Sequence, residues 1–270
     1  MKILSIIPAR GGSKGIPLKN LVRLDGKPLL DYTVTASLQS KLVNRTIVST
    51  DNKNIADQAK KLGAEVIARP KKLSTDESLL EPVIQHVLDF LNTKKKYQPD
   101  IILLLQNTSP LRTSEHIDGA LSLMLKNEYD SVLSGYPWQI FSWKVKKDSS
   151  IIPYSYDPQK RARRQESGQR ILENGAIYAT TRSAFKKSQC RISGKVGFYP
   201  MPMEFCYDID EKGDLNSTEL ILQQQKINNL FSVKGKNIVL TGASGLLGSY
   251  YARILLEAGA NMALIDHNTQ

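Results

Sequence analysis

The 270-residue chain contains only two cysteines, Cys190 and Cys206, which are too few for a disulfide framework and fit a reducing compartment. It also contains no apolar run near the roughly 18 residues that a membrane-spanning helix requires. The first residues lack the pattern of a cleavable signal peptide. We therefore expect a cytoplasmic protein that has no membrane partner.

Aromatic residues make up only 7% of the chain, although its formal net charge is +11. The sequence lacks runs of Lys and Arg with interleaved aromatic residues, and no nucleic-acid-binding motif is readable. We therefore expect no nucleic-acid partner. A positive field of this size still favours anionic ligands, and small phosphorylated or carboxylated substrates fit it.

Short aliphatic runs alternate with helix-like stretches through the first half of the chain. The runs that predict strands cover residues 2–8, 45–50, 64–68, 100–106 and 130–135. The helix-like stretches cover residues 28–40, 52–62, 79–93 and 114–127. This alternation predicts an α/β fold with a mostly parallel sheet and helices on both faces. In such sheets, ligands bind at the carboxyl ends of the strands.

The alternation breaks at residues 137–170, where apolar and polar residues alternate as in a hairpin or an arm. We interpret this segment as an insertion outside the main sheet. Its aromatic side chains, Trp138, Phe141 and Trp143, would form either a subunit contact or a local core under the arm. A further strand is expected at 174–180 and a terminal helix at 214–227.

Residues 236–268 read as a strand, a glycine-rich turn, a helix and a second strand. Gly242, Gly245 and Gly248 have the spacing of a dinucleotide cradle, and Asp266 follows the second strand where a ribose hydroxyl would be bound. The stretch resembles the start of a short-chain dehydrogenase/reductase domain. The sequence stops four residues after Asp266, and one βαβ unit cannot bury its own apolar faces. We therefore expect no dehydrogenase activity.

These patterns divide the chain into a main domain at 1–230, a linker at 231–235 and a truncated dinucleotide-binding start at 236–270. A dehydrogenase that binds NAD through the tail is a rival hypothesis. The missing catalytic half disfavours it.

The loop after the first expected strand combines glycines with cations: its residues are Arg10, Gly11, Gly12, Lys14, Gly15 and Lys19. Glycines allow several backbone N–H groups to point into one concavity, and the cations add full positive charges around it. The combination suits a triphosphate. It is not the Walker pattern, because no lysine follows Gly15 and no glycine precedes it by five positions.

Asp208 and Asp210 are two residues apart on what we expect to be a strand, so that both carboxylates face one side. Mg²⁺ binds one or two carboxylates together with phosphate oxygens and water, and such a pair suits it. A solvated, acidic strand end is the alternative interpretation.

Five segments, at 7–21, 48–70, 103–117, 164–178 and 207–215, together resemble the acylneuraminate cytidylyltransferases, or CMP-sialic acid synthetases, in order and spacing. The resemblance covers about residues 1–228. It implies a Rossmann-like nucleotidyltransferase sheet with a protruding dimerisation arm and a homodimer. It also implies Mg²⁺-dependent transfer of CMP from CTP to the anomeric hydroxyl of a nonulosonic acid of the sialic, legionaminic or pseudaminic type, with release of pyrophosphate.

The same resemblance assigns roles to individual residues. It implies triphosphate contacts by Arg10, Ser13 and Lys19, nucleotide binding by Gly12 and Asn20, and recognition of cytosine by Arg69. It also implies sugar contacts by Gln106 and Arg164, and metal binding by Asp208 and Asp210, which with Lys19 form the expected catalytic set.

Three departures from the family pattern lie near the expected sugar pocket. Asn107 stands where the family often has proline, Ser-Gly at 167–168 replaces Leu-Pro, and Leu172 replaces a frequent basic residue. The nucleotide loop is intact, so the resemblance specifies CTP more firmly than the sugar. The alternatives are a synthetase for CMP-3-deoxy-manno-octulosonate and an inactive nucleotide-binding fusion remnant.

Overall fold

The computed structural model describes residues 1–13, 15–138, 141–160 and 170–267. The chain divides into two compact units, Met1–Glu219 and Leu220–Gln270. The break between them falls within helix α6 (Lys212–Phe231). The linker expected at 231–235 stays a prediction.

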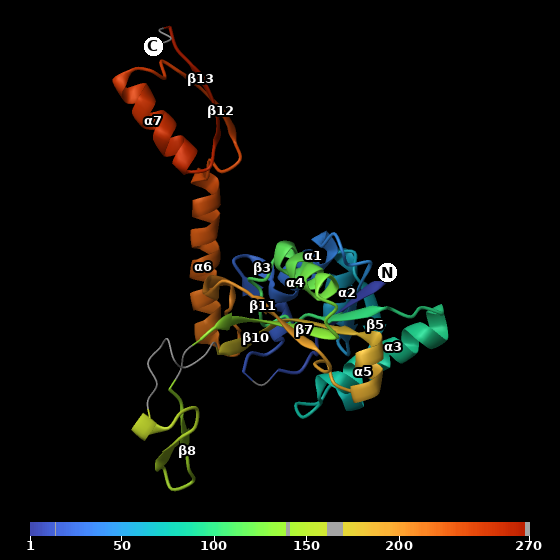
Figure 1. Cartoon of the computed structure of the whole chain (residues 1–270). Coiled ribbons are helices and arrows are strands. Elements are labelled where there is room, and N and C mark those ends of the chain that lie inside the picture. The colour runs from blue at the N-terminus through green and yellow to red at the C-terminus, as the bar shows by residue number, and fades with distance from the viewer. Residues whose placement is uncertain (14, 139–140, 161–169, 268–270) are drawn as a thin grey trace. The chain divides into compact units, whose positions relative to one another are not determined.

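The first unit is built around a seven-stranded sheet with the strand order β11-β7-β10-β6-β1-β4-β5 (Figure 1). Its strands are β1 (Ile3–Pro8), β4 (Arg45–Thr50), β5 (Glu65–Ala68), β6 (Ile101–Leu104), β7 (Ser131–Pro137), β10 (Ile171–Thr181) and β11 (Val196–Pro200). Strand β10 runs antiparallel to β6 and β7, and the other neighbouring pairs are parallel. The prediction of a mostly parallel sheet is confirmed.

Helices cover both faces of this sheet. Five helices are involved: α1 (Leu29–Gln39), α2 (Lys53–Lys61), α3 (Leu80–Lys95), α4 (Ser114–Lys126) and α5 (Arg182–Ser188). Side chains of α1, α2 and α4 pack in one core cluster with Ile3 and Ile7 of β1, whereas side chains of α3 and α5 pack in a second cluster with Leu4 and Ile6. Because β1 is buried on both faces, its sequence is a continuous apolar run rather than an alternating one.

Except for the strand expected at Asp208 and Asp210, the strands and helices expected from the sequence are present in the first unit, with ends shifted by a few residues. The elements that sequence reasoning missed are short. They are the hairpin of β2 (Arg23–Leu24) and β3 (Lys27–Pro28), helix α5, strand β11, and the 3₁₀ turns η1 (Lys19–Leu21), η2 (Lys71–Leu73), η3 (Pro158–Lys160) and η4 (Met203–Phe205). Elements of two to seven residues carry too few positions for a hydrophobic period to be visible.

The insertion contains a hairpin of β8 (Trp143–Val145) and β9 (Ile151–Pro153) that forms its own two-stranded sheet. The two strands of this hairpin are therefore not part of the main sheet, whereas Pro137 still belongs to β7. The rings of Phe141 and Trp143 each pack edge-on against Tyr156, with centroids 4.6 Å and 6.0 Å apart. The expected subunit contact through this hairpin stays a prediction.

The second unit contains β12 (Asn237–Thr241), α7 (Leu246–Glu257) and β13 (Asn261–Ile265), and its two strands pair in parallel. The expected βαβ unit is therefore present. Among the described residues of both units, no helix combines the length and the apolar character that crossing a membrane would require.

Candidate functional site

A cleft of about 580 Å³ opens at the carboxyl ends of β1, β5 and β6. These strands run parallel in the sheet, so the loops that follow them gather at one edge. Eight of the residues singled out in the sequence line this cleft. They are Arg10, Ser13, Lys19 and Asn20 after β1, Arg69 after β5, Gln106 after β6, and Asp208 and Asp210 before α6.

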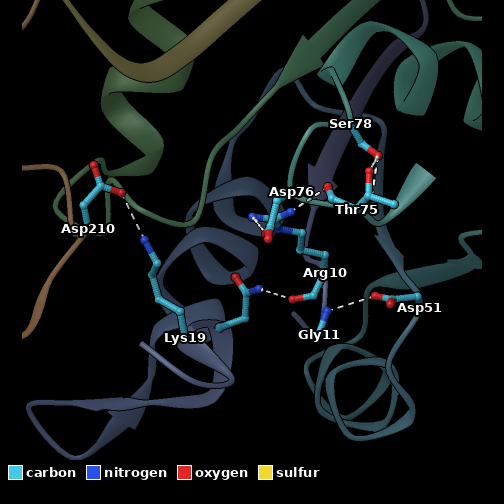
Figure 2. A network of polar contacts seen from close by, with 9 residues as sticks. Arg10, Gly11, Lys19, Asp51, Thr75, Asp76, Ser78 and Asp210 are labelled. Carbon is cyan, nitrogen blue, oxygen red and sulfur yellow. Dashed lines mark hydrogen bonds and ion pairs between the residues drawn. The ribbon is translucent and has the colours of Figure 1, made fainter. Parts of the chain in front are cut away.

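The glycine loop is held in place by contacts with two other segments. The backbone N–H of Gly11 donates to Asp51 Oδ1 at 2.9 Å (Figure 2). At Gly15, a Cβ atom would lie 2.5 Å from the backbone oxygen of Asp210, so only glycine permits this approach. Leu18, with φ 48°, then turns the chain into η1, which begins at Lys19. Gly12 has open space where its Cβ would be.

The Arg10 guanidinium is bound to the segment that follows β5. It donates to the carbonyl of Thr75 at 2.6 Å and pairs with Asp76 Oδ1 at 2.9 Å (Figure 2). The hydroxyls of Thr75 and Ser78 are 2.8 Å apart and stabilise the turn. All of these residues line the cleft, so this segment forms one of its walls.

Asn20 is buried and ties the start and end of the glycine loop together. Its Nδ2 donates to the carbonyl of Arg10 at 2.9 Å, and its Oδ1 accepts from Asn107 Nδ2 at 2.9 Å. Asn107 Nδ2 also approaches the carbonyl of Pro8 at 3.4 Å. A proline at position 107 would have no donor for these contacts, so the asparagine links the loop after β6 to the loop after β1.

Lys19 joins the glycine loop to the segment before α6. Its Nζ donates to the carbonyl of Ile209 at 2.7 Å and to Asp210 Oδ1 at 3.1 Å (Figure 2). The Lys19 side chain is only 14% exposed, whereas that of Asp210 is 78% exposed. The lysine is therefore largely buried in the cleft lining, and the carboxylate keeps access to solvent.

The prediction that Asp208 and Asp210 lie on a strand is wrong. Residues 206–210 are irregular, and the bond from Ile209 N to the carbonyl of Thr108, 2.8 Å long, is not part of a strand ladder. The Ile209 side chain is buried, while the aspartates on either side of it line the cleft. The two carboxylates thus share one side of the segment without being in a strand.

The pKa of Asp208 is raised, first because the surrounding protein disfavours its charged form and then because of the nearby charges of Asp210 and Asp214. A hydrogen bond from Thr108 and the charge of Lys19 act in the opposite direction. Asp214 Oδ2 accepts from the backbone N–H groups of Asp210 and Glu211, each at 2.8 Å, and these bonds lower its pKa. Asp214 is thereby engaged at the start of α6, and Asp208 and Asp210 are the two carboxylates of this segment that line the cleft.

Within the described residues, no group of three or more His, Cys, Asp or Glu side chains could hold a metal ion. Two carboxylates on one side of a cleft fit Mg²⁺, which completes its coordination with water and phosphate oxygens. The residues present therefore suit a metal that binds together with a phosphorylated ligand.

Arg69 is 7% exposed and lines the cleft, and its guanidinium is held by hydrogen bonds to β4. Its Nη2 donates to the carbonyl of Ser49 at 2.6 Å and its Nε to the hydroxyl of the same residue at 3.2 Å. Burial lowers the pKa of Arg69 to about 10, so it stays cationic at neutral pH. Leu73, Leu80 and Val83 add apolar surface to the cleft.

The remaining predicted residues fall outside the cleft or outside the described residues. Arg164 lies outside the described residues. The glycines Gly242, Gly245 and Gly248 form the turn between β12 and the first turn of α7. There the carboxylate of Asp266 accepts from the backbone N–H of Ser244 at 2.6 Å. The dinucleotide-binding role of these residues stays a prediction.

Sequence reasoning missed Thr75, Asp76 and Ser78, since nothing in a polar "STDES" stretch shows that it will bind an arginine 65 residues away. It also missed Arg112, whose guanidinium is fully buried beneath the loop after β6. An arginine just before an expected helix reads as a surface charge. The apolar neighbours Pro110 and Leu111 were the only local signals that Arg112 could be buried.

The comparisons with known proteins agree with this geometry. Residues 4–239 match the model of a protein family described as cytidylyltransferase. N-acylneuraminate cytidylyltransferase A of Danio rerio is 36% identical over 211 residues, which cover 77% of this chain and 48% of that protein. The N-acylneuraminate cytidylyltransferase of Streptococcus agalactiae serotype V is 32% identical over 225 residues, covering 79% of this chain and 52% of the relative. The chain thus spans about half the length of these curated relatives.

Two solved structures share the fold. A CMP:2-keto-3-deoxy-manno-octonic acid synthetase complexed with CTP has a TM-score of 0.62 at 19% identity, and covers 83% of this chain and 100% of its own. The 4-diphosphocytidyl-2C-methyl-D-erythritol synthase of Anaerococcus prevotii has a TM-score of 0.57 at 14% identity, and covers 82% of this chain and 98% of its own. Because the family model matches most of the chain, the protein belongs to the cytidylyltransferase family.

Proposed function

We propose that the chain transfers CMP from CTP to the anomeric hydroxyl of a nonulosonic acid of the sialic type. The observation that carries this proposal is the meeting of the cationic glycine loop and two aspartates in one cleft, joined by the contact of Lys19 with Asp210. The relatives that are 32–36% identical to the chain are named N-acylneuraminate cytidylyltransferases, which favours this substrate class over 3-deoxy-manno-octulosonate.

The triphosphate would lie along the glycine loop. Arg10 and Lys19 supply positive charge, and Ser13 supplies a hydroxyl donor at the same wall of the cleft. Donors that are already fixed by protein contacts need little reorganisation when negative charge moves onto the leaving phosphate. Gly12 leaves room for the ligand to approach the backbone.

Asp208 and Asp210 would hold Mg²⁺ together with phosphate oxygens, and the bound ion would supply charge neutralisation at the phosphates. The hydrogen bond from Lys19 would keep Asp210 in place. The hydrogen bond of Thr108 to Asp208 orients the second carboxylate.

Arg69 and the apolar side chains of Leu73, Leu80 and Val83 would surround the cytosine. Gln106 would contact the acidic sugar, and Arg164, which lies outside the described residues, would bind its carboxylate through a two-pronged contact. Asn20, with both amide ends engaged by Arg10 and Asn107, would act by fixing the loop against the nucleotide.

In the reaction, the sugar hydroxyl oxygen forms a bond to the α-phosphorus, and the bond from that phosphorus to the bridging oxygen breaks. Pyrophosphate leaves with the electron pair, and the hydroxyl proton passes to solvent or to a carboxylate. The role of the protein is mainly to position the two substrates and to stabilise the charge of the leaving group.

A pyrophosphate-release panel tests the proposal. CTP, UTP, ATP and GTP are each combined with N-acetylneuraminic, legionaminic, pseudaminic and 3-deoxy-manno-octulosonic acids in the presence of Mg²⁺. We expect release only with CTP and a nonulosonic acid. Release with 3-deoxy-manno-octulosonic acid alone would favour the alternative synthetase, and no release with any acid would favour an inactive nucleotide-binding protein.

The same proposal includes a homodimer formed through the β8–β9 hairpin and a cytoplasmic location. Exposed apolar side chains on the hairpin, among them Trp143 and Ile151, support a subunit contact there.

For the tail we propose a vestigial dinucleotide-binding start, on the basis of its glycine turn and Asp266. Tight binding of NAD by the chain would instead favour a functional dinucleotide site.

A further inference from the structure

Arg112 is an arginine that is buried without a matching charge. Its residue is 2% exposed, in the loop between β6 and α4. Burial lowers its pKa to about 9, which leaves it cationic at neutral pH, and no ion pair between Arg112 and a carboxylate is found among the described residues. An uncompensated buried cation is costly to a fold. Arg112 is not among the residues that line the cleft.

The guanidinium instead binds backbone carbonyls from two segments. Its Nη1 lies 3.2 Å from the carbonyl oxygens of Gln106 and Ser109, and 3.1 Å from that of Ala176 in β10. Its Nε and Nη2 are buried and have no hydrogen-bond partner within the part of the chain that the structure describes. Arg112 therefore joins the loop after β6 to the middle of β10 at a single point.

This junction lies directly behind the side chain of Gln106. Gly175, the residue before Ala176, has φ +69°, and a Cβ atom there would lie 2.6 Å from Gln106 Oε1. The amide of Gln106 is thus packed against the backbone of β10. Arg112 binds next to both partners of this contact. Its guanidinium donates to the backbone carbonyl of Gln106 and to that of Ala176, the residue after Gly175.

We propose that Arg112 is a positioning residue that fixes Gln106 for the acidic sugar. This inference rests on the proposed function, because it takes Gln106 as a sugar contact. An apolar side chain of similar length would fill the volume of Arg112 without the cost of burying charge, yet it could not hold the three carbonyls. The arginine therefore serves the arrangement of the cleft rather than the stability of the core.

The test compares Arg112→Met and Arg112→Lys with the wild-type chain by steady-state kinetics in both substrates. For Arg112→Met, we expect the KM for the sugar acid to rise at least about tenfold, since a misplaced contact group weakens binding and orientation together. The KM for CTP should stay within about twofold. Arg112→Lys should raise the KM for the sugar acid less than Arg112→Met does. Arg253→Met, which replaces an exposed arginine of α7, should change neither KM.

Two further variants keep the test valid if Arg112→Met folds poorly. Gly175→Ala places a methyl group against Gln106 and should raise the KM for the sugar acid selectively as well. In a Gln106→Ala background, Arg112→Lys should cause no further rise, because a residue that acts through Gln106 has nothing left to position. The melting temperature of each variant is measured alongside.

Equal rises in both KM values, or an additive effect of Arg112→Lys and Gln106→Ala, would overturn the role of Arg112 while leaving the proposed function intact. An unchanged KM for the sugar acid in Arg112→Met would overturn it as well. A wild-type chain that turns over no nonulosonic acid would instead contradict the proposed function itself.

Discussion

Lys19 Nζ lies 3.1 Å from Asp210 Oδ1, although the two residues are 191 positions apart in the sequence. The contact, shown in Figure 2, joins the glycine loop after β1 to the segment before α6, and both residues line the cleft. It places a cation and a carboxylate side by side at the point where a metal-bound triphosphate would lie. Both partners therefore have a structural role as well as the proposed binding role.

Replacing Lys19 by alanine should weaken the binding of CTP far more than the binding of the sugar acid. The variant loses a cation in the cleft and also releases the carbonyl of Ile209 and the carboxylate of Asp210. We expect kcat/KM for CTP to fall about 100-fold or more, measured by pyrophosphate release at varied CTP. Lys126→Ala, which removes the same charge from the exposed end of α4, is the matched control. Equal losses for the two substrates would argue against a triphosphate role for Lys19.

Alanine at Gly15 and at Gly12 should have different consequences. A Cβ at position 15 would meet the backbone oxygen of Asp210 at 2.5 Å, whereas one at position 12 meets nothing within 4 Å. Gly15→Ala should therefore lower the melting temperature of the ligand-free chain, and Gly12→Ala should not. If Gly12→Ala nevertheless raises the KM for CTP, the ligand itself occupies the space beside Gly12. A thermal shift of equal size in the two variants would contradict the packing at Gly15.

Asp76 should compete with the triphosphate for Arg10. The ion pair is partly exposed, with 31% and 39% of the two side chains accessible, so its strength is about 0.2–1 kcal/mol. Asp76→Asn should accordingly lower the KM for CTP by a factor of about 1.4 to 5. The control is Asp57→Asn at an exposed position of α2. A higher KM for CTP in Asp76→Asn would mean that the aspartate helps to bind the nucleotide rather than opposing it.

The pair of Arg45 and Glu65 should make stability depend on pH at the β4–β5 edge. Arg45 binds both carboxylate oxygens of Glu65 and lowers its pKa from the ordinary value of 4.5. A depressed carboxyl pKa stabilises the fold above 4.5, and this contribution is lost as the pH falls through the lower folded-state value. Glu65→Gln should therefore cost about 0.5 kcal/mol of unfolding free energy at pH 7. In urea titrations, the difference from the wild type should shrink as the pH falls below 4.5; a constant difference would contradict the assignment.

Much of the fold was predictable because its signals are local. Strand β1 is a continuous apolar run that ends in a glycine-rich loop, and α4 has a clear apolar period between Thr113 and Asn127. Parallel neighbours then bring Arg10, Arg69 and Gln106 to one edge of the sheet with no further information. These residues could be placed together from the sequence for that reason.

The contacts that shape the cleft were not predictable, because each one pairs residues that are distant in the sequence. The strand expected at Asp208 and Asp210 proved to be irregular, since alternation of apolar and acidic residues does not reveal whether a neighbouring strand is available. Likewise, no local feature of Asp76 or Arg112 indicates its partners at positions 10 and 176. Tertiary contacts decide the conformation and the partners of these residues, and a single sequence does not reveal such contacts.

The most direct test of the account is Mg²⁺-dependent pyrophosphate release from CTP and N-acetylneuraminic acid by the wild-type chain and by Asp210→Ala. We expect the melting temperature of the variant to stay within about 2 °C of the wild-type value, because Asp210 is an exposed residue. We also expect the variant to release no pyrophosphate at any Mg²⁺ concentration. A variant that turns over at the wild-type rate with the same dependence on Mg²⁺ would contradict the claim that the glycine loop and the two aspartates bind one metal-bridged CTP.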